Sequence, residues 1–252
     1  MVSNMVHRFV IIASGWNCEG YVKPCIDSIL NQTYPNWEAA IISDGSTDVT
    51  NDEIGNWVCG LNIPNTIMGT HYMDNEGAAR KRFEAIHVHS VSPEDIIVFL
   101  GLDDELLPNA LERIAQEYDN GKLCTYGNWI DNHGYMCPPD SLDFPDEIHA
   151  TRDYRKVKFR STAPNTFKRK LFDRMSENDF KVNGEWIKAT TESPMMFAAL
   201  EMSGKDRIGV IKGPIYLYNK RGNDNARNRM PVGYQDMVYK EIVSRPKFDL
   251  LP

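Results

Sequence analysis

The sequence predicts an α/β fold in which a mostly parallel central sheet is flanked by helices. Its first half repeats one unit, a short apolar run followed by a polar turn and a helical pattern, which is typical of parallel sheets covered by helices. The apolar runs are continuous rather than alternating, as in strands buried on both faces. An apolar content of 42% and a charged content of 25% are ordinary for a globular domain.

The first two units occupy the N-terminal part of the chain. Residues 9–13 (FVIIA) predict a buried strand, and residues 22–30 place Val, Ile and Leu on one face of a helix. Pro24 is compatible with that helix because it falls near its first turn. Residues 37–42 predict a second strand, and the polar turn 43–48 supplies a cap for another helix.

A third unit follows with a different turn. Residues 66–72 predict a strand, residues 75–77 (NEG) form the turn, and the next helix carries Arg80, Lys81 and Arg82. The helix therefore brings basic side chains close to the end of a strand.

The stretch 96–108 (IIVFLGLDDELLP) has the clearest functional signal. Five apolar residues predict a buried strand, and Asp103 and Asp104 follow it directly. Carboxylates at the C-terminal end of such a strand lie where open α/β sheets bind ligands. Side by side they can hold a hard divalent cation that takes its other ligands from phosphate and water. The alternative is that both carboxylates only cap the following helix.

The remainder of the chain is less regular. Residues 123–130 predict a strand, and residues 135–165 form a long excursion of the kind that folds over a site. The later elements are helices at 170–175 and 193–202, a strand at 210–218, and a candidate mobile loop after Asn219.

Charge is unevenly distributed along the chain. Residues 1–150 carry a net charge of −16 and residues 151–252 a net charge of +9, although the whole chain carries only −7. The basic part begins with a dense run of Lys and Arg between residues 152 and 174. Both a solvated face and a surface that attracts an anionic partner are consistent with such a run.

The cysteines and the apolar runs indicate the compartment. The five cysteines are odd in number and include no C-x-x-C pair, which predicts reduced thiols in a cytoplasmic protein. The run at 9–13 is too short for a membrane span or a signal sequence. Peripheral membrane contact through the basic part stays open.

Several segments, in this order and spacing, resemble glycosyltransferase family 2, whose members are inverting nucleotide-sugar enzymes of the GT-A fold. The resemblance implies a Rossmann-like GT-A sheet with a nucleotide-sugar-binding half at 1–134. It also implies an acceptor-binding half, with a C-terminal loop and tail, at 135–252, both within one compact domain. The similar segments are 11–17, 25–34, 43–48, 99–108 and 214–221.

The resemblance also implies roles for individual residues around the donor. Ser14 and Asp44 would lie beside the nucleobase, with Asp44 accepting from a uracil-like N–H. The stretch from Asn75 to Arg82 is similar to the family's Asn-x-Gly…Ala-Arg segment, which would put Asn75 at the donor and Arg82, or alternatively Arg80, near phosphate. Arg221 in the late loop would clamp the diphosphate.

The metal and the catalytic base follow from the same resemblance, and the chain departs from the family pattern at three positions, of which Ser43, where the family often has a second Asp, lies in the nucleotide-binding turn. Asp103 would contact ribose or metal, and Asp104 would ligate a Mn²⁺ or Mg²⁺ that bridges the diphosphate. Gly101 stands where many members of the family carry a first Asp. Ser193 stands where the family usually has its catalytic Asp, so the prediction for the base moves to Glu192.

The function expected is metal-dependent, inverting transfer of a sugar from a nucleotide-diphosphate sugar, with UDP as the nucleotide, to an acceptor hydroxyl. The basic part suits an anionic acceptor such as a phosphorylated polymer or modified DNA, although a nucleic acid is not favoured. A non-catalytic nucleotide- or glycan-binding module on the same fold is the alternative from another class. A nucleotidyltransferase is disfavoured because residues 14–20 contain no basic residue.

Overall fold

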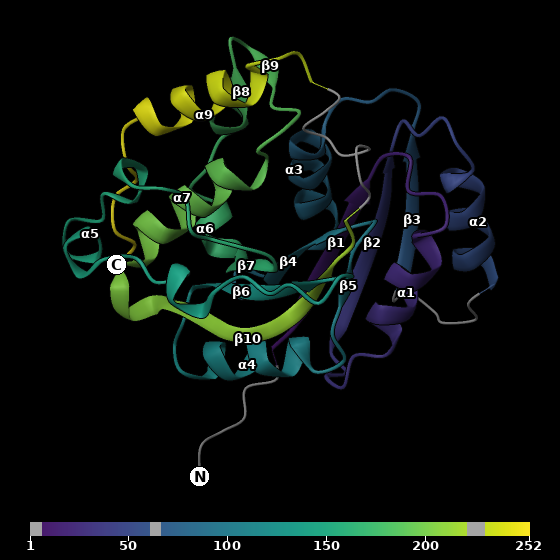
Figure 1. The fold of residues 1–252 in the computed structure, drawn as a ribbon, viewed down its shortest axis with the longest axis horizontal. Helices are drawn as coiled ribbons and strands as arrows, with labels where there is room; N and C mark the ends of the chain where they lie inside the picture. Colours follow the sequence, from purple (N-terminus) through teal and green to yellow (C-terminus); the bar gives the residue numbers. More distant parts are fainter. Residues whose placement is uncertain (1–6, 61–66, 221–229) are drawn as a thin grey trace.

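The structure, a computed structural model, describes residues 7–60, 67–220 and 230–252. One sheet of eight strands forms its centre, in the order β3-β2-β1-β4-β7-β6-β10-β5, and helices cover both faces (Figure 1). Adjacent strands among β3, β2, β1 and β4 are parallel, as are β6 and β10. The predicted α/β fold with a mostly parallel, helix-flanked sheet is confirmed.

The described elements alternate between strands and helices in the N-terminal part. The strands are β1 (Phe9–Gly15), β2 (Trp37–Asp44), β3 (Ile67–Tyr72), β4 (Ile96–Gly101), β5 (Glu105–Leu106), β6 (Cys124–Asp131), β7 (Asn165–Lys168), β8 (Lys181–Val182), β9 (Glu185–Trp186) and β10 (Ile208–Tyr218). The α-helices are α1 (Val22–Leu30), α2 (Thr50–Gly60), α3 (Ala78–His89), α4 (Ala110–Asp119), α5 (Asp146–Thr151), α6 (Arg169–Phe172), α7 (Glu192–Ser203) and α9 (Tyr234–Ser244).

The continuous apolar run of β1 is explained by burial on both faces. Phe9, Ile11 and Ala13 belong to the core beneath α1, α2 and α4, while Val10 and Ile12 belong to the core beneath α3 and α7. All five residues are fully buried. Because side chains alternate across a strand, each helical layer receives half of the run.

The strand register aligns three strand ends at one edge of the sheet. Ser14 of β1 lies opposite Ile42 of β2 and opposite Gly101 of β4. The polar turns that follow these strands therefore meet, as the parallel arrangement predicts.

The sequence did not reveal β7, which enters the sheet antiparallel between β4 and β6. Its four residues, Asn-Thr-Phe-Lys, are polar for a buried strand. The fully buried Thr166 compensates for this because its hydroxyl bonds to those of Thr125 and Tyr118, each at 2.7 Å. A buried polar side chain is tolerated when its hydrogen bonds are satisfied.

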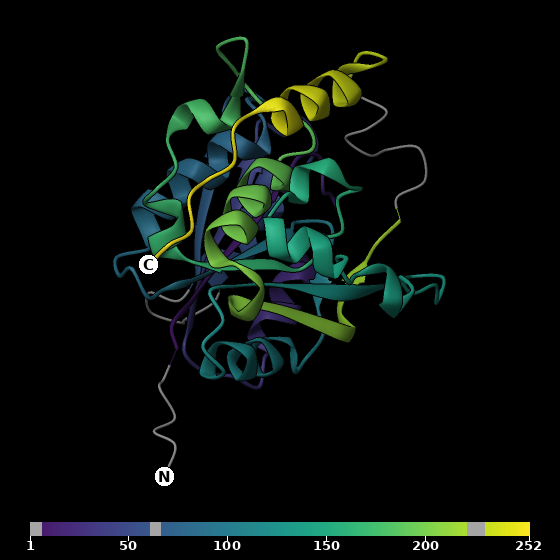
Figure 2. The same ribbon diagram turned by 90° about the vertical axis from the view of Figure 1, so that its left-hand side faces the viewer.

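Two segments of the C-terminal part contain elements that the sequence did not predict. The excursion 135–165 contains α5 and places Leu142, Phe144 and Tyr154 in the core, while its residues 159 and 161–163 line the cavity described below. The tail also contains a helix, α9, which packs on α7 and runs along the outside of the molecule (Figure 2). Val238 and Ile242 are the fully buried residues of α9. The division at residue 134 stays a prediction.

Most of the basic run between residues 152 and 174 is bound within the protein. Arg155 forms an ion pair with Glu201, whose side chain is fully buried, at 2.6 Å. Arg152 donates to the backbone oxygens of Glu201 and Phe248, which ties the C-terminal segment to α7. Other members contact carboxylates or carbonyls in the same way: Lys156, Arg160, Lys168, Arg169 and Lys170. The run is therefore mainly structural.

Candidate active site

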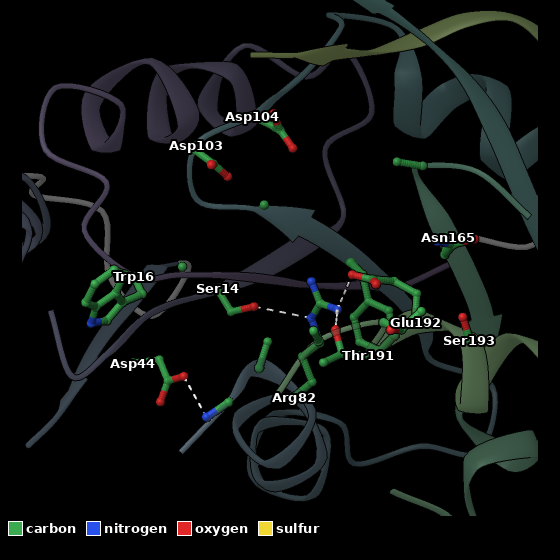
Figure 3. A pocket seen from close by; sticks show the side chains of 18 of the residues that line it. Ser14, Trp16, Asp44, Arg82, Asp103, Asp104, Asn165, Thr191, Glu192 and Ser193 are labelled. Carbon is green, nitrogen blue, oxygen red and sulfur yellow. Dashed lines mark hydrogen bonds and ion pairs between the residues drawn. The ribbon is translucent and has the colours of Figure 1, made fainter. Parts of the chain in front are cut away.

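The edge where β1, β2 and β4 end opens into a cavity of about 920 Å³ (Figure 3). Strand ends and loops from both parts of the chain form its walls. The sequence-predicted site residues that line it are Ser14, Asp44, Asn75, Arg82, Asp103, Asp104 and Glu192. Arg221 lies outside the described residues. The structure thus brings together side chains that are far apart in the sequence.

Asp44 fastens the loop that leads into α3 to the end of β2. Its two carboxylate oxygens accept hydrogen bonds from the backbone N–H groups of Glu76 at 3.0 Å and Gly77 at 2.9 Å. Burial raises the pKa of Asp44, and the two N–H donors partly oppose that shift. Gly45 has φ +69°, and a Cβ there would lie 2.4 Å from the backbone of Asp74. The turn therefore requires glycine for this close approach.

Asp104 is held rigidly at the end of β4. The Tyr216 hydroxyl donates to its Oδ2 at 2.7 Å, and the Asn219 N–H donates to its Oδ1 at 2.8 Å. Burial, followed by the charge of Asp103, raises the pKa of Asp104 to about 7. Asp103 is more exposed and lies beside it in the cavity wall (Figure 3).

Gly101 explains how the two carboxylates fit together. A Cβ at this position would lie 2.7 Å from Asp104 Oδ2 and 2.9 Å from Asp103 Oδ1. Both carboxylates are therefore packed over a position that has no side chain. Any residue larger than glycine, including the Asp found in many family members, would displace at least one of them.

These residues fit a divalent cation that is shared with a substrate. No group of three or more His, Cys, Asp or Glu able to hold a metal occurs among the described residues. Asp103 and Asp104 bring two carboxyl groups to the cavity, and burial first, then the charge of Asp103, raises the pKa of Asp104. Mg²⁺ and similar ions accept one or two carboxylates and complete their shell with phosphate and water.

Arg82 links three elements across the floor of the cavity. It is 5% exposed and lies over the Phe99 ring at 4.8 Å. Its guanidinium donates to Ser14 Oγ at 3.2 Å, to Thr191 Oγ1 at 2.9 Å, and to the carboxylate of Glu192 (Figure 3). The predicted phosphate ligand is thus near the predicted base.

Glu192 is the first residue of α7, and 37% of its side chain is exposed. Burial would raise the pKa of Glu192, but the charge and hydrogen bond of Arg82 outweigh it, so the pKa is lowered. The carboxylate is therefore ionised at neutral pH and able to accept a proton. Ser193, at the position of the family's Asp, is only 2% exposed.

The residues before α7 form a strained wall of the same cavity. Thr190 has φ +61°, an unusual conformation for a non-glycine residue. Its Oγ1 is buried and has no hydrogen-bond partner in the described structure. Strained backbone of this kind is common at ligand sites.

Sequence reasoning missed several residues of the cavity. Tyr216 and Tyr218 of β10 also line it. No motif marked these two residues; the only signal was the alternation of tyrosines at the end of a late strand. Trp129 of β6 lines the cavity as well, and from the sequence it was a candidate for stacking on a sugar ring, with burial in the core as the alternative. The position of all three residues depends on the pairing of β6 with β10, which cannot be read from either segment alone.

Comparison with known proteins shows the family of the chain. A family model, Glycosyl transferase family 2, matches residues 10–176. Chondroitin synthase of Pasteurella multocida is 34% identical over 126 residues, or 48% of this chain and 12% of that protein. S. aureus TarS 1-349 in complex with UDP-GlcNAc matches with a TM-score of 0.69 and 17% identity over 94% of this chain and 65% of that chain.

A mannosyltransferase from Pyrobaculum calidifontis, in complex with GDP-Man and Mn²⁺, has a TM-score of 0.54 and 16% identity. The match covers 92% of this chain and 60% of that chain. The chain thus spans 12% of the chondroitin synthase and less than two thirds of each solved chain, 65% and 60%.

The architecture is that of the GT-A glycosyltransferases. The chain belongs to glycosyl transferase family 2. The predicted family, fold and glycosyltransferase class are therefore confirmed. In the described part of the chain, no helix combines the length and apolar character needed to cross a membrane.

Proposed function

We propose that the chain transfers a sugar from UDP-sugar to a hydroxyl group of a glycan, with inversion at C1 of the sugar. The observation that carries the proposal is the convergence of Asp44, Arg82, Asp103 and Glu192 on one cavity at the C-terminal edge of parallel strands. The relatives add support, since one is named a chondroitin synthase and a structural neighbour holds UDP-GlcNAc.

In this proposal the donor lies across the ends of β2, β1 and β4. Asp44 and Ser14 contact the nucleobase, and Asn75 lies near the phosphates. Asp103 and Asp104 would hold a Mn²⁺ or Mg²⁺, which supplies charge neutralisation to the departing diphosphate. Each oxygen of Asp104 accepts one hydrogen bond, from Tyr216 and from Asn219, which fixes this carboxylate at the end of the strand and leaves lone pairs for a cation.

Glu192 acts as the general base. It accepts the proton of the acceptor hydroxyl while the acceptor oxygen bonds to C1 and the bond from C1 to the diphosphate oxygen breaks. The donor diphosphate attracts Arg82 and weakens its pair with Glu192. Loss of that positive neighbour raises the pKa of Glu192, so donor binding makes the carboxylate a stronger base.

The acceptor is a glycan hydroxyl, and its charge stays open. An anionic acceptor, including a phosphorylated polymer or modified DNA, has little support left because most of the basic run is bound internally. Lys158 and Arg174 are its exposed members without a side-chain partner among the described residues. A cytoplasmic location stays part of the proposal; all five cysteines are described, and all are free thiols.

The test is a calorimetric titration of UDP, GDP and CDP, each with Mn²⁺ and with EDTA. We expect UDP to bind preferentially with Mn²⁺, and Asp103→Asn or EDTA to weaken binding at least about tenfold. Asp140→Asn, an exposed carboxylate outside the cavity, is the matched control and leaves binding unchanged. Absence of binding to all three nucleotides overturns the proposal. Binding without release of UDP from any UDP-sugar would favour the non-catalytic module.

A further inference from the structure

Three aromatic side chains lie together at the rim of the cavity, and none of the roles above uses them. Trp129 comes from β6, Tyr135 from the turn after β6, and Tyr218 from the end of β10. The Trp129 ring centroid is 5.8 Å from that of Tyr135 and 5.7 Å from that of Tyr218. We call these three residues the aromatic shelf.

The aromatic shelf is not explained by core packing. Tyr135 is 55% exposed and Tyr218 is 37% exposed. Trp129 is half-buried against the core, and both Trp129 and Tyr218 line the cavity. Large aromatic side chains that stay exposed beside a cavity are characteristic of binding sites.

The turn that carries Tyr135 is held firmly in place. Asp131 is 2% exposed, and its Oδ1 accepts the backbone N–H of His133 at 2.9 Å and of Tyr135 at 2.8 Å. Lys220 forms an ion pair with Asp131 and also lies 5.4 Å from the centre of the Tyr135 ring. A preorganised ring loses little conformational entropy when a ligand binds to it.

The aromatic shelf lies on the side of the carboxylates away from the nucleobase site. In the sheet, β1 and β2 are on one side of β4, whereas β6 and β10 are on the other. Asp44 ends β2, while Tyr218 ends β10 directly before Asn219, which bonds to Asp104. The phenol of Tyr218, like that of tyrosine generally, is a neutral hydrogen-bond donor at neutral pH.

We propose that the aromatic shelf is a subsite that stacks on a pyranose ring of the acceptor glycan. This inference rests on the proposed function, because it assigns the acceptor side of the same cavity. The C–H face of a pyranose is apolar and complements an aromatic ring, while the phenol and indole groups bond its hydroxyls at the edge. The shelf thus selects a glycan chain over a small alcohol or a flexible aliphatic acceptor.

The test measures binding of four hexasaccharides, maltohexaose, cellohexaose, chitohexaose and chondroitin hexasaccharide, to the UDP- and Mn²⁺-loaded protein by saturation-transfer NMR and calorimetry. We expect at least one to bind, and Tyr135→Leu and Tyr218→Leu each to weaken it about 3- to 10-fold. Tyr135→Phe and Tyr218→Phe, which keep the ring, are the matched controls and retain most of the affinity. Thermal unfolding checks that each variant folds.

Two results overturn the inference. One is that none of the four hexasaccharides binds, and the other is that both Leu variants bind as well as the wild type. UDP binding, measured in the same samples, separates failure of the subsite inference from failure of the proposed function. UDP binding without hexasaccharide binding removes the subsite alone, whereas loss of UDP binding in the wild type removes the proposed function first.

Discussion

The two sides of the cavity are built in different ways. On the proposed donor side, short polar turns directly follow parallel strands, and backbone N–H groups hold the carboxylate of Asp44. On the proposed acceptor side, aromatic rings from β6 and β10 depend on long-range strand pairing. The residues of the donor side therefore belong to short local motifs, whereas those of the acceptor side come together only when the sheet forms.

The same contrast holds for charge. The acidic side chains of the N-terminal part include Asp103 and Asp104, which both line the cavity, and burial raises the pKa of Asp104. The basic side chains of the C-terminal part mostly tie helices and the tail together, as Arg155 does with Glu201. The net charge of a sequence does not distinguish charged side chains that are available to bind a ligand from those that are paired within the protein.

The largest expected effect joins the two sides at Glu192. Glu192→Gln keeps an oxygen for Arg82 but cannot accept a proton, so we expect kcat to fall about 10²- to 10⁴-fold. UDP affinity should change by less than about threefold. Steady-state release of UDP measures kcat, and calorimetry measures the UDP affinity. The exposed Glu185→Gln is the control. Full turnover in Glu192→Gln would assign the base to another group.

The second effect concerns the basic side chains and should appear in stability alone. Arg155→Met leaves the buried carboxylate of Glu201 without its cationic partner, which costs about 3–5 kcal/mol of unfolding free energy. Urea unfolding measures this cost. Lys156→Met, which breaks an exposed pair with Asp153, should cost less than about 1 kcal/mol. Equal effects would mean that the Arg155 pair contributes no more than a surface contact.

Sequence reasoning succeeded where the information was local. The strands β1, β2 and β4 and their polar turns were predicted because burial on two faces leaves a continuous apolar run. All described site residues that were predicted do line one cavity. Sequence reasoning failed for β7 and α9. The strand β7 is polar, with Thr166 bonded to Thr125 and Tyr118, so it lacks the apolar run of a buried strand. The helix α9 has only two fully buried residues, Val238 and Ile242, so its apolar periodicity is weak.

The third effect tests the local construction of the donor side. Asp44→Asn replaces one carboxylate oxygen by an NH₂ group, which then faces the N–H of either Glu76 or Gly77. We expect the loop before α3 to lose one of the two hydrogen bonds that hold it to Asp44, and the UDP affinity to fall about tenfold. Calorimetry measures the change, with the exposed Asp52→Asn of α2 as the control. An unchanged affinity would place the nucleobase away from Asp44.

The smallest expected effect tests whether side chains of the basic run between residues 152 and 174 bind the acceptor. Lys158 and Arg174 are exposed and lack side-chain partners among the described residues, so the double variant Lys158→Ala/Arg174→Ala removes charge without breaking a described contact. With a neutral glycan acceptor we expect kcat/KM to change by less than about twofold at any salt concentration. A polyanionic acceptor predicts the opposite, a loss that shrinks as salt screens the attraction. Measuring transfer at low and high salt for both proteins separates these outcomes, because only a polyanion makes the basic side chains part of the acceptor side.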